Sequence, residues 1–545
     1  MSAETLFDLL RTSATATPDA VALTDTSTHE TVTYAELQDR ALRAAAGLRA
    51  LGFSRGDTLA IWLSNGVEWV VLEFASAYLG VLVCGLNPRY KPNEIAHLLR
   101  VSQARALVFA PSANGIDYAA MVGEAITTAG PSSALSRLIV IDRTGTTWAP
   151  PAGLELTGYE ELLAAAATSD EETGRPGDLI NVFGTSGTTS FPKLAAHDLG
   201  SVARHARETA AALEYGAAES VLCFLPFCGA YGFITLTSTL AAGARAVIMP
   251  VFKPDAAIRL VAREKITSIL GLEATIRALF DVPGLHAAAV ESWVKGGIAG
   301  LSATALVERA EDEFGIALTN LYGSSELFAM MACWPLTESS AMRSVPGGRL
   351  LGTDMHVRAV DSRTREILKD GESGELELSG YNVTSGYLSN PAANEKAFTA
   401  DGWYRTGDQG ATLEGGRAVR YEGRLADTLR LRGYLVSPVE IEELLATHAV
   451  VTEVQVVGTS NPATGEDRAV AFVRLSDPPV GLDAELRAHC RARAASWKVP
   501  DAVLFVTEFP TTPSANGEKV QKAKLREMAE AFFADSAGIP GAHAS

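Results

Sequence analysis

A run rich in glycine, serine and threonine, residues 184–193, carries the residue types that bind phosphate groups. Glycine lets backbone N–H groups turn toward an anion because no Cβ stands in the way, and hydroxyl groups and a lysine supply further donors. The run differs from a standard P-loop, since Lys193 follows Pro192 rather than glycine and no serine or threonine comes after it. Taken alone, it is equally well explained as a surface loop.

Four further motifs follow this run in a fixed order. They lie at 320–326, at 402–408, at 423–427 continuing to Gly433, and at 516–522. Together with the first run they closely resemble the adenylate-forming superfamily, in particular its acyl-CoA synthetase branch. The resemblance extends from Val32 to Lys522 and so covers nearly the whole chain. It implies an enzyme that joins a carboxylic acid to AMP, expelling pyrophosphate, and then lets a thiol displace AMP.

This reaction needs cations, because negative charge develops on phosphoryl oxygens as the acid attacks ATP. By the resemblance, Glu326 and the hydroxyl of Thr188 hold Mg²⁺, a hard ion suited to oxygen ligands. The alternative for Glu326 is a solvated acid after a turn. The resemblance also implies that the β- and γ-phosphates of ATP are bound by Thr185, Ser186, Gly187, Thr189 and Lys193.

The resemblance assigns the rest of the nucleotide to the later motifs. Tyr322, followed by Gly323, is expected to stack on adenine. Ser325 is expected to reach the α-phosphate, where the family commonly has threonine. Asp408 can accept hydrogen bonds from both ribose hydroxyls, because an ionised carboxylate has acceptor sites to spare; its alternative role is to cap a turn. Arg424 matches the basic residue that also meets the ribose.

Lys519 is the expected catalytic lysine, since by the resemblance it bridges the substrate carboxylate and the ATP phosphates as a compact charge on a long stem. Its neighbours Lys522 and Lys524 are expected to be solvated. The family swings a small C-terminal domain about a hinge between its two half-reactions. The hinge position is Ala426 here, where the family commonly has Asp or Lys. In the rotated state Gly433 is expected to approach the pantetheine of coenzyme A, because a side chain would obstruct its tunnel.

The acid pocket is expected around residues 225–232, which resemble the family's pocket motif with Gly229 in place of a histidine or aromatic residue. Residues 220–244 contain no aspartate, which disfavours an α-amino acid because its ammonium group would be buried unpaired. The glycines, Ala299 and Met330 of the expected lining indicate a roomy cavity. Medium-chain, aryl and polycyclic acids are therefore all possible substrates. The alternative is that these are core residues. The expected lining is Phe227, Cys228, Gly229, Tyr231, Gly297, Ile298, Ala299, Gly300, Leu327 and Met330.

No carrier-protein domain follows Lys522, so the thiol is expected to come from another molecule, and coenzyme A is the expected one. Loading of a separate carrier protein is the alternative. A catalytically inactive nucleotide-binding protein is less favoured, since Lys193, Glu326, Asp408 and Lys519 are all present. The sequence leaves open whether the protein forms a homodimer.

The elements expected to position these residues alternate between helix and strand. Apolar residues at helical spacing and short β-branched runs predict parallel sheets covered by helices. Helices are predicted over 35–51, 68–78 and 440–445, and strands over 58–63, 81–83, 107–109, 138–141, 357–360, 374–378 and 453–457.

With 545 residues, the chain exceeds what a single core usually fills. Together with the resemblance, this predicts an α/β fold. We expect a large N-terminal domain, 1–424, made of two doubly wound α/β subdomains and a small β-rich subdomain. A mobile, smaller α+β C-terminal domain is expected over 427–533, followed by a flexible tail over 534–545.

Composition excludes several other classes. The formal charge of -18, with no basic stripe, argues against a nucleic-acid partner. The five cysteines form no CxxC pair, which indicates reduced cytoplasmic thiols rather than a disulfide or zinc framework. No secretory signal is visible at the start of the sequence. The charge-free stretch 221–244 is long enough to cross a bilayer, but proline and glycine interrupt it, so we expect buried core and no membrane span.

Overall fold

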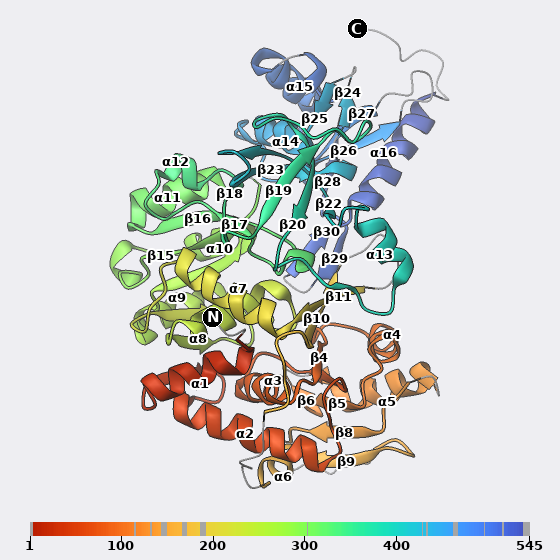
Figure 1. Cartoon of the computed structure of the whole chain (residues 1–545). Helices are drawn as coiled ribbons and strands as arrows, with labels where there is room; N and C mark the ends of the chain where they lie inside the picture. The colour runs from red at the N-terminus through yellow and green to blue at the C-terminus, as the bar shows by residue number, and fades with distance from the viewer. Residues whose placement is uncertain are drawn as a thin grey trace. The chain divides into compact units, whose positions relative to one another are not determined.

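The computed structural model describes residues 4–113, 116–130, 133–142, 150–165, 172–185, 192–301, 303–427, 429–431, 434–460, 467–494, 496–514 and 517–537. The chain forms two compact units. The first comprises residues within 1–357, 378–404 and 417–419, and the second comprises residues within 358–377, 405–416 and 420–545 (Figure 1). The predicted domain limits, with a boundary at 424–427, stay a prediction.

The first unit contains an eight-stranded sheet with the order β21-β11-β10-β4-β3-β5-β8-β9. Its strands are β3 (Thr58–Trp62), β4 (Leu82–Gly85), β5 (Ala106–Phe109), β8 (Arg137–Val140), β9 (Glu155–Gly158), β10 (Leu179–Thr185), β11 (Lys193–Asp198) and β21 (Gly386–Tyr387). All neighbours from β10 to β9 are parallel, whereas β11 is antiparallel to both β10 and β21. Strand β3 lies between β4 and β5, so the strand order reverses there, as it does in doubly wound sheets.

A second sheet of the first unit has the order β18-β17-β16-β15-β14-β12-β13-β1-β2. Its strands are β1 (Val21–Asp25), β2 (Glu30–Thr33), β12 (Ser220–Cys223), β13 (Arg245–Ile248), β14 (Ser268–Leu272), β15 (Lys295–Ala299), β16 (Ala317–Tyr322), β17 (Ala332–Cys333) and β18 (Gly347–Leu350). The six neighbouring strands β16, β15, β14, β12, β13 and β1 are parallel to one another. The outer strands β17 and β18 at one end and β2 at the other pair in antiparallel fashion. The predicted pair of α/β sheets is therefore confirmed.

Helices cover these sheets. They include α2 (Tyr34–Ala50), α3 (Val67–Leu79), α4 (Pro92–Ser102), α5 (Tyr118–Ala129), α7 (Leu199–Ala212), α8 (Ala230–Ala241), α9 (Pro254–Glu264), α10 (Glu273–Phe280) and α11 (Thr304–Phe314). Helix α2 begins at Tyr34, one residue before the predicted start, because Thr33 and Glu36 form a capping box. The Glu36 carboxylate accepts from the Thr33 N–H at 2.8 Å, and the Thr33 hydroxyl accepts from the Glu36 N–H at 3.2 Å.

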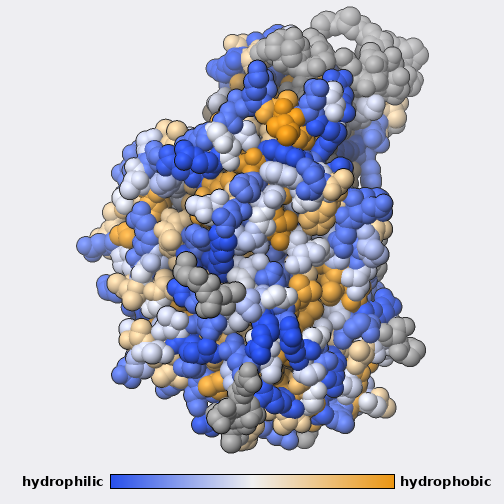
Figure 2. Space-filling model, in the orientation of Figure 1, coloured by the Kyte–Doolittle hydropathy of each residue, from blue (hydrophilic) through white to orange (hydrophobic). Residues whose placement is uncertain are grey.

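The charge-free stretch 221–244 forms β12, a turn and the buried helix α8, as expected. In the described part of the chain, every helix is too short or too polar to cross a membrane. All five cysteines are buried and free. On the face shown in Figure 2, hydrophilic residues predominate and hydrophobic ones form small separate patches.

The second unit contains most residues of four neighbouring strands, in the order β19-β20-β22-β23. A smaller α+β part follows them in the sequence. The four strands are β19 (His356–Val360), β20 (Gly374–Ser379), β22 (Tyr404–Leu413) and β23 (Ala418–Arg424). The α+β part contains β24 (Leu429–Leu431), β25 (Tyr434–Val436), α14 (Pro438–Ala446), β26 (Val454–Ser460), β27 (Asp467–Arg474), α15 (Leu482–Arg493), β28 (Ala502–Val506), β29 (Thr511–Ser514), β30 (Gly517–Val520) and α16 (Lys522–Ala537).

The individual helices and strands predicted from the sequence are confirmed, and most of their ends shift by one or two residues. Helix α16 continues to Ala537, past the position at which the tail was expected to begin. Residues 538–545 lie outside the described residues.

Candidate active site

The phosphate-binding run connects two antiparallel strands of the eight-stranded sheet. Thr185, at the end of β10, stands opposite Lys193, at the start of β11. Residues 186–191 lie outside the described residues, and with them the predicted phosphate ligands Ser186, Gly187 and Thr189 and the metal ligand Thr188. The described part therefore places Thr185 and Lys193 side by side at the point where the run leaves and re-enters the sheet.

Glu326 lies in a tight turn between strands β16 and β17. The two strands are antiparallel, with Tyr322 opposite Ala332, and the turn contains the short 3-10 helix η3 (Ser325–Leu327). Gly323 is required here because a Cβ at this position would overlap the carbonyl oxygen of Ala329. The chain can thus reverse direction within a few residues and present Glu326 at the carboxyl end of β16.

The turn is completed by two residues with left-handed backbone, Phe328 at φ 55° and Ala329 at φ 65°. Such a conformation costs a residue with a side chain roughly 1–2 kcal/mol. Phe328 is only 1% exposed, and its ring centre lies 5.0 Å from that of His197, 5.2 Å from His205 and 5.8 Å from Phe183. Burial of a phenylalanine stabilises by about 1.5–3 kcal/mol, which offsets the strain at Phe328 itself.

Three successive carbonyl oxygens of η3 each accept a hydrogen bond from another segment. His197 Nε2 donates to Ser325 O at 2.7 Å, the Thr384 N–H donates to Glu326 O at 2.7 Å, and the Asn382 amide donates to Leu327 O at 3.0 Å. These bonds fix the backbone that carries the Glu326 carboxylate.

His197 must carry its proton on Nε2, since a carbonyl oxygen can only accept. Burial lowers the pKa of His197 to about 4, and its contact with Ser325 opposes this shift. The imidazole is therefore neutral at pH 7. It lies on β11, the strand that begins with Lys193.

Tyr387 joins Glu326 to the phosphate-binding run. Its hydroxyl donates to Glu326 Oε1 at 2.9 Å, and Lys193 Nζ lies 4.9 Å from the centre of its ring. Tyr387 is held there because β21 pairs with β11, with Ala195 opposite Tyr387. The structure thus brings the predicted metal ligand and the predicted phosphate-binding lysine to a single tyrosine.

These donors fit a magnesium ion. Mg²⁺ is usually held by one or two carboxylates together with substrate phosphates and water, rather than by a cage of protein ligands. Glu326 supplies one carboxylate, and the described residues contain no cluster of three or more His, Cys, Asp or Glu that could hold a metal by itself. Such an arrangement leaves the remaining ligand positions to a nucleotide.

Asn65, which the sequence did not point to, makes two hydrogen bonds with the backbone of the pocket motif, residues 225–232. The Asn65 amide donates to Leu225 O at 2.9 Å, and its Oδ1 accepts from the Phe227 N–H at 2.9 Å. Gly229 directly precedes α8, at its N-cap position, and makes no side-chain capping bond there. The hydroxyl of Tyr231 donates to Gly271 O at 3.3 Å. Phe227, Cys228 and Tyr231 are all buried.

Glycines in β15 and directly after it make room for neighbouring side chains. A Cβ at Gly297 would lie 2.5 Å from Leu321 Cδ1, and one at Gly300 would lie 2.6 Å from Glu273 Oε2. Three other predicted lining residues, Ile298, Leu327 and Met330, are at most 1% exposed, and Ala299 is half-buried. This packing favours the core interpretation for Gly297, while the pocket role of the set stays a prediction.

In the second unit, the predicted ribose ligands Asp408 and Arg424 lie together. Arg424 Nη1 is 3.0 Å from Asp408 Oδ1 and donates to Thr406 O at 3.1 Å. The Asp408 side chain is 4% exposed and that of Arg424 is 50% exposed. Gly407 has φ 65°, in the left-handed region that favours glycine. The pair presents a buried carboxylate beside a half-exposed guanidinium.

Lys519 lies in β30, opposite Thr512 of β29. Its side chain and the predicted pantetheine-binding Gly433 lie outside what the structure describes, and Ala426 belongs to the 3-10 helix η4 (Leu425–Asp427). The expectation that Lys522 is solvated was wrong. Its Nζ lies 3.6 Å from Glu442 Oε1, a half-buried carboxylate that favours a counter-charge.

Two family models match the chain. Residues 10–388 match the AMP-binding enzyme family, and residues 440–516 match the AMP-binding enzyme C-terminal domain. The chain belongs to this family. It is thus an AMP-forming acid–thiol ligase of the adenylate-forming superfamily, as the resemblance implied.

Individual relatives of this ligase cover nearly its full length. It is 31% identical over 547 residues to the putative acyl-CoA synthetase YngI of Bacillus subtilis (strain 168), covering 97% of this chain and 98% of that protein. It is 30% identical over 516 residues to the mitochondrial medium-chain acyl-CoA ligase ACSF2 of Danio rerio, covering 91% and 84%. Its structure resembles ATP-bound MatB from Rhodopseudomonas palustris with a TM-score of 0.84 and 23% identity, covering 97% and 99% of the two chains.

Sequence reasoning missed three side chains that organise the first unit of this ligase: His197, Tyr387 and Asn65. A signal existed for His197, since it is a histidine at the end of an otherwise apolar run, 194–196. Tyr387 and Asn65 gave no such signal, because their partners lie far away in the sequence.

Proposed function

We propose that this ligase is an ATP-dependent acyl-CoA synthetase that activates a hydrophobic carboxylic acid as acyl-AMP and then transfers the acyl group to coenzyme A. The observation that carries the proposal is the meeting of Lys193 and Glu326 at Tyr387, at 4.9 Å and 2.9 Å. Adenylation needs a cation and a metal-binding carboxylate around the same phosphates. The similarity to acyl-CoA synthetases of B. subtilis and D. rerio supports the choice of coenzyme A.

In the proposed first step, a carboxylate oxygen of the acid attacks the α-phosphorus of ATP, and the bond from that phosphorus to pyrophosphate breaks. A Mg²⁺ ion held by Glu326 and Thr188 would neutralise charge on the phosphate oxygens. We assign the β- and γ-phosphates to Thr185, Ser186, Gly187, Thr189 and Lys193. Neutral His197 keeps the Glu326 turn rigid without adding charge of its own.

We assign the nucleoside and the α-phosphate to the remaining polar residues. Asp408 accepts from the ribose hydroxyls, with Arg424 beside it. Tyr322, followed by Gly323, stacks on adenine, and the Ser325 hydroxyl reaches the α-phosphate. Asp408 suits this role because a carboxylate has several acceptor sites, and its Oδ1 lies 3.0 Å from the Arg424 guanidinium.

For the second step, we propose that the C-terminal domain moves. Lys519 would neutralise the acid and the phosphates during adenylation, and rotation about Ala426 would then withdraw it and bring Gly433 to the pantetheine. In this step the thiol sulfur attacks the acyl carbon and AMP leaves.

We propose a hydrophobic acid without a charged amine: a medium-chain, aryl or polycyclic acid. The support is the apolar character of the pocket motif and the absence of an acidic residue from 220–244. The five free, buried thiols favour a reducing compartment such as the cytoplasm.

ATP–pyrophosphate exchange across a panel of carboxylic acids tests the first step. Incubation of the active acids with free coenzyme A, followed by mass spectrometry of the thioester, tests the second. Acyl-AMP that accumulates without acyl-CoA would instead indicate an acyl-AMP ligase that loads a separate carrier protein. An absence of exchange with every acid would indicate an inactive nucleotide-binding protein.

A further inference from the structure

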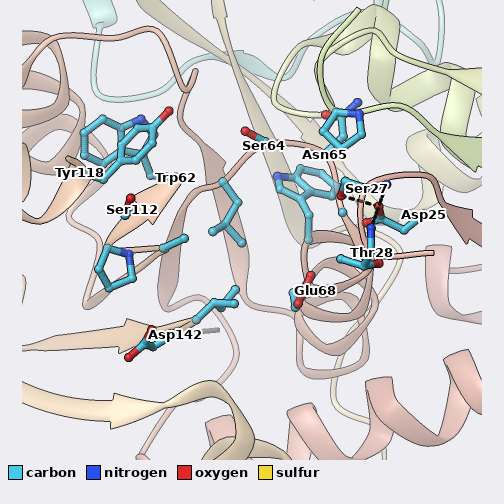
Figure 3. Close-up of a pocket in the computed structure, with 17 residues that line it drawn as sticks. Asp25, Ser27, Thr28, Trp62, Ser64, Asn65, Glu68, Ser112, Tyr118 and Asp142 are labelled. Atoms are coloured by element: carbon cyan, nitrogen blue, oxygen red, sulfur yellow. Dashed lines mark hydrogen bonds between the residues drawn. The ribbon is translucent and has the colours of Figure 1, made fainter. Parts of the chain in front are cut away.

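A cavity of about 340 Å³ lies in the first unit (Figure 3). Apart from Asn65, which holds the backbone of the pocket motif, its lining residues have no role in the proposed reaction. Its walls come from segments that follow the carboxyl ends of β3, β5 and β8, represented by Ser64, Pro111 and Asp142, and from the hairpin after β1. Strand β3 is the position at which the strand order of the sheet reverses. Open α/β sheets bind ligands in the crevice beyond the carboxyl ends of their strands at such a point.

The cavity combines aromatic walls with negative charge. Trp62 and Tyr118 meet edge to face with ring centres 4.9 Å apart, and Figure 3 shows them across the cavity from Asp25. Glu68 and Asp142 also line it, and none of the lining residues that the structure describes is Lys, Arg or His. Aromatic faces and carboxylates both attract cations. An anion, including the acid substrate, is disfavoured here.

Asp25 offers an acceptor that the described part of the chain leaves open. It is 1% exposed, and its Oδ1 accepts from the Ser27 N–H at 2.8 Å, the Ser27 hydroxyl at 2.7 Å and the Thr28 N–H at 3.2 Å. Its other oxygen, Oδ2, accepts no hydrogen bond from the described residues. A buried carboxylate is costly unless it is paired, so this oxygen favours a positively charged donor.

Trp69, another residue of the cavity wall, carries a buried donor without a partner in the described part of the chain. It lines the cavity, is 1% exposed, and its indole N–H finds no acceptor among the described residues. The indole N–H can only donate, and buried donors nearly always have a partner. Trp69 therefore needs an acceptor that the described protein does not supply.

We propose that this cavity binds a small organic ammonium ion that also carries an oxygen acceptor, as an aromatic amino alcohol does. The ammonium group donates to Asp25 Oδ2, the oxygen accepts from Trp69 Nε1–H, and the apolar part packs against Trp62 and Tyr118. The ligand is a second small molecule, bound apart from the acid and the nucleotide.

Calorimetry on the full-length protein tests this with a matched pair of probes, 2-amino-1-phenylethanol and 1-phenylethane-1,2-diol, which differ only in the ammonium group. We expect the amine to bind and the diol to bind at least about tenfold more weakly, because hydrogen bonds to charged groups are the stronger ones. Saturating ATP should leave binding of the amine unchanged.

Two variants locate the probe. Asp25→Asn keeps an acceptor for the Ser27 turn but removes the charge, and Trp69→Phe removes only the N–H and part of the ring. Each should weaken the amine at least about fivefold, whereas Glu124→Gln, a loss of charge at an exposed position on α5, should not. The Trp69 variant and the wild-type probe pair keep the test valid if the Asp25 variant does not fold.

Four outcomes would overturn the proposal. One is that the amine does not bind, which would mean that the cavity holds only water. The others are equal binding of the diol, displacement by ATP, and unchanged binding in both folded variants.

Discussion

The hydroxyl of Tyr387 donates a 2.9 Å hydrogen bond to Glu326 Oε1, and these two residues come from strands and turns 61 positions apart in the sequence. The same tyrosine ring lies 4.9 Å from Lys193 Nζ. Tyr387 thus acts as a positioning residue: it orients the carboxylate expected to bind Mg²⁺ and packs against the lysine expected to bind phosphate.

Tyr387→Phe removes the hydroxyl and keeps the ring. A hydrogen bond to a charged group is worth about 1.5–3 kcal/mol, so we expect the Mg²⁺ concentration for half-maximal ATP–pyrophosphate exchange to rise by about tenfold or more. The KM for the acid should change little. A magnesium titration of the exchange reaction measures this.

Tyr404→Phe is the matched control, since it removes a neighbouring hydroxyl, 3.4 Å from that of Tyr387, and keeps the hydroxyl of Tyr387 that donates to Glu326. A Tyr387→Phe enzyme with the wild-type magnesium dependence would show that the hydroxyl does not position the carboxylate.

His197 predicts a pH dependence of stability. Its folded-state pKa, about 4, lies below the ordinary value of 6.5 because of burial. Between these values the unfolded chain binds more protons than the folded one, so stability is lost as the pH falls from about 6.5 toward 4. The linked free energy is on the order of 3 kcal/mol.

The measurement is Tm between pH 4 and pH 7 for the wild type and for His197→Gln, which retains an N–H donor for Ser325 O. We expect the variant to lose less stability on acidification. Part of the slope should remain, because burial also lowers the pKa of His205, to about 3. Identical slopes in the two proteins would exclude His197 as a source of acid sensitivity.

The sequence predicted the local features of the site well. Glu326 and Asp408 stand within contiguous motifs, and the sheets follow from apolar periodicity. Tyr387 could not be predicted in the same way, because its role depends on the pairing of β21 with β11, which adds a strand from distant sequence. The error for Lys522 has the same origin: its partner Glu442 lies on α14, and only the fold brings the two charges to 3.6 Å.

Asp408→Asn tests the ribose assignment. The variant keeps one acceptor oxygen but loses the charge. The NH2 group that replaces the second oxygen can only donate, so it cannot accept from a hydroxyl. We expect the KM for ATP to rise by about tenfold or more, the effect of losing one hydrogen bond to a charged group. Discrimination between ATP and 3′-deoxy-ATP should shrink at the same time.

The ratio of the KM values for 3′-deoxy-ATP and ATP distinguishes a lost contact with the ribose from a general disturbance of the fold. Loss of the Asp408–Arg424 ion pair, 3.0 Å long in the wild type, could weaken nucleotide binding by disturbing the fold, but it would weaken both nucleotides alike. If the ratio stays at the wild-type value while the KM rises, Asp408 supports the fold rather than the ribose.

Lys519→Ala should separate the two half-reactions. We expect acyl-AMP formation to fall by at least about 100-fold, because a fixed cation at the developing phosphoryl charge contributes several kcal/mol. Preformed acyl-AMP should still react with coenzyme A at nearly the wild-type rate, since the lysine is not used once the anhydride exists. Single-turnover assays of each step measure the two rates.

Lys524→Ala is the control for this experiment, because it removes an exposed lysine from the start of α16, five positions further along the chain. It should leave both half-reactions unchanged. Equal losses of adenylation and of thioester formation in the Lys519 variant would contradict a domain that presents different faces to the two steps. In that case Lys519 would have to act in both steps from one arrangement of the enzyme.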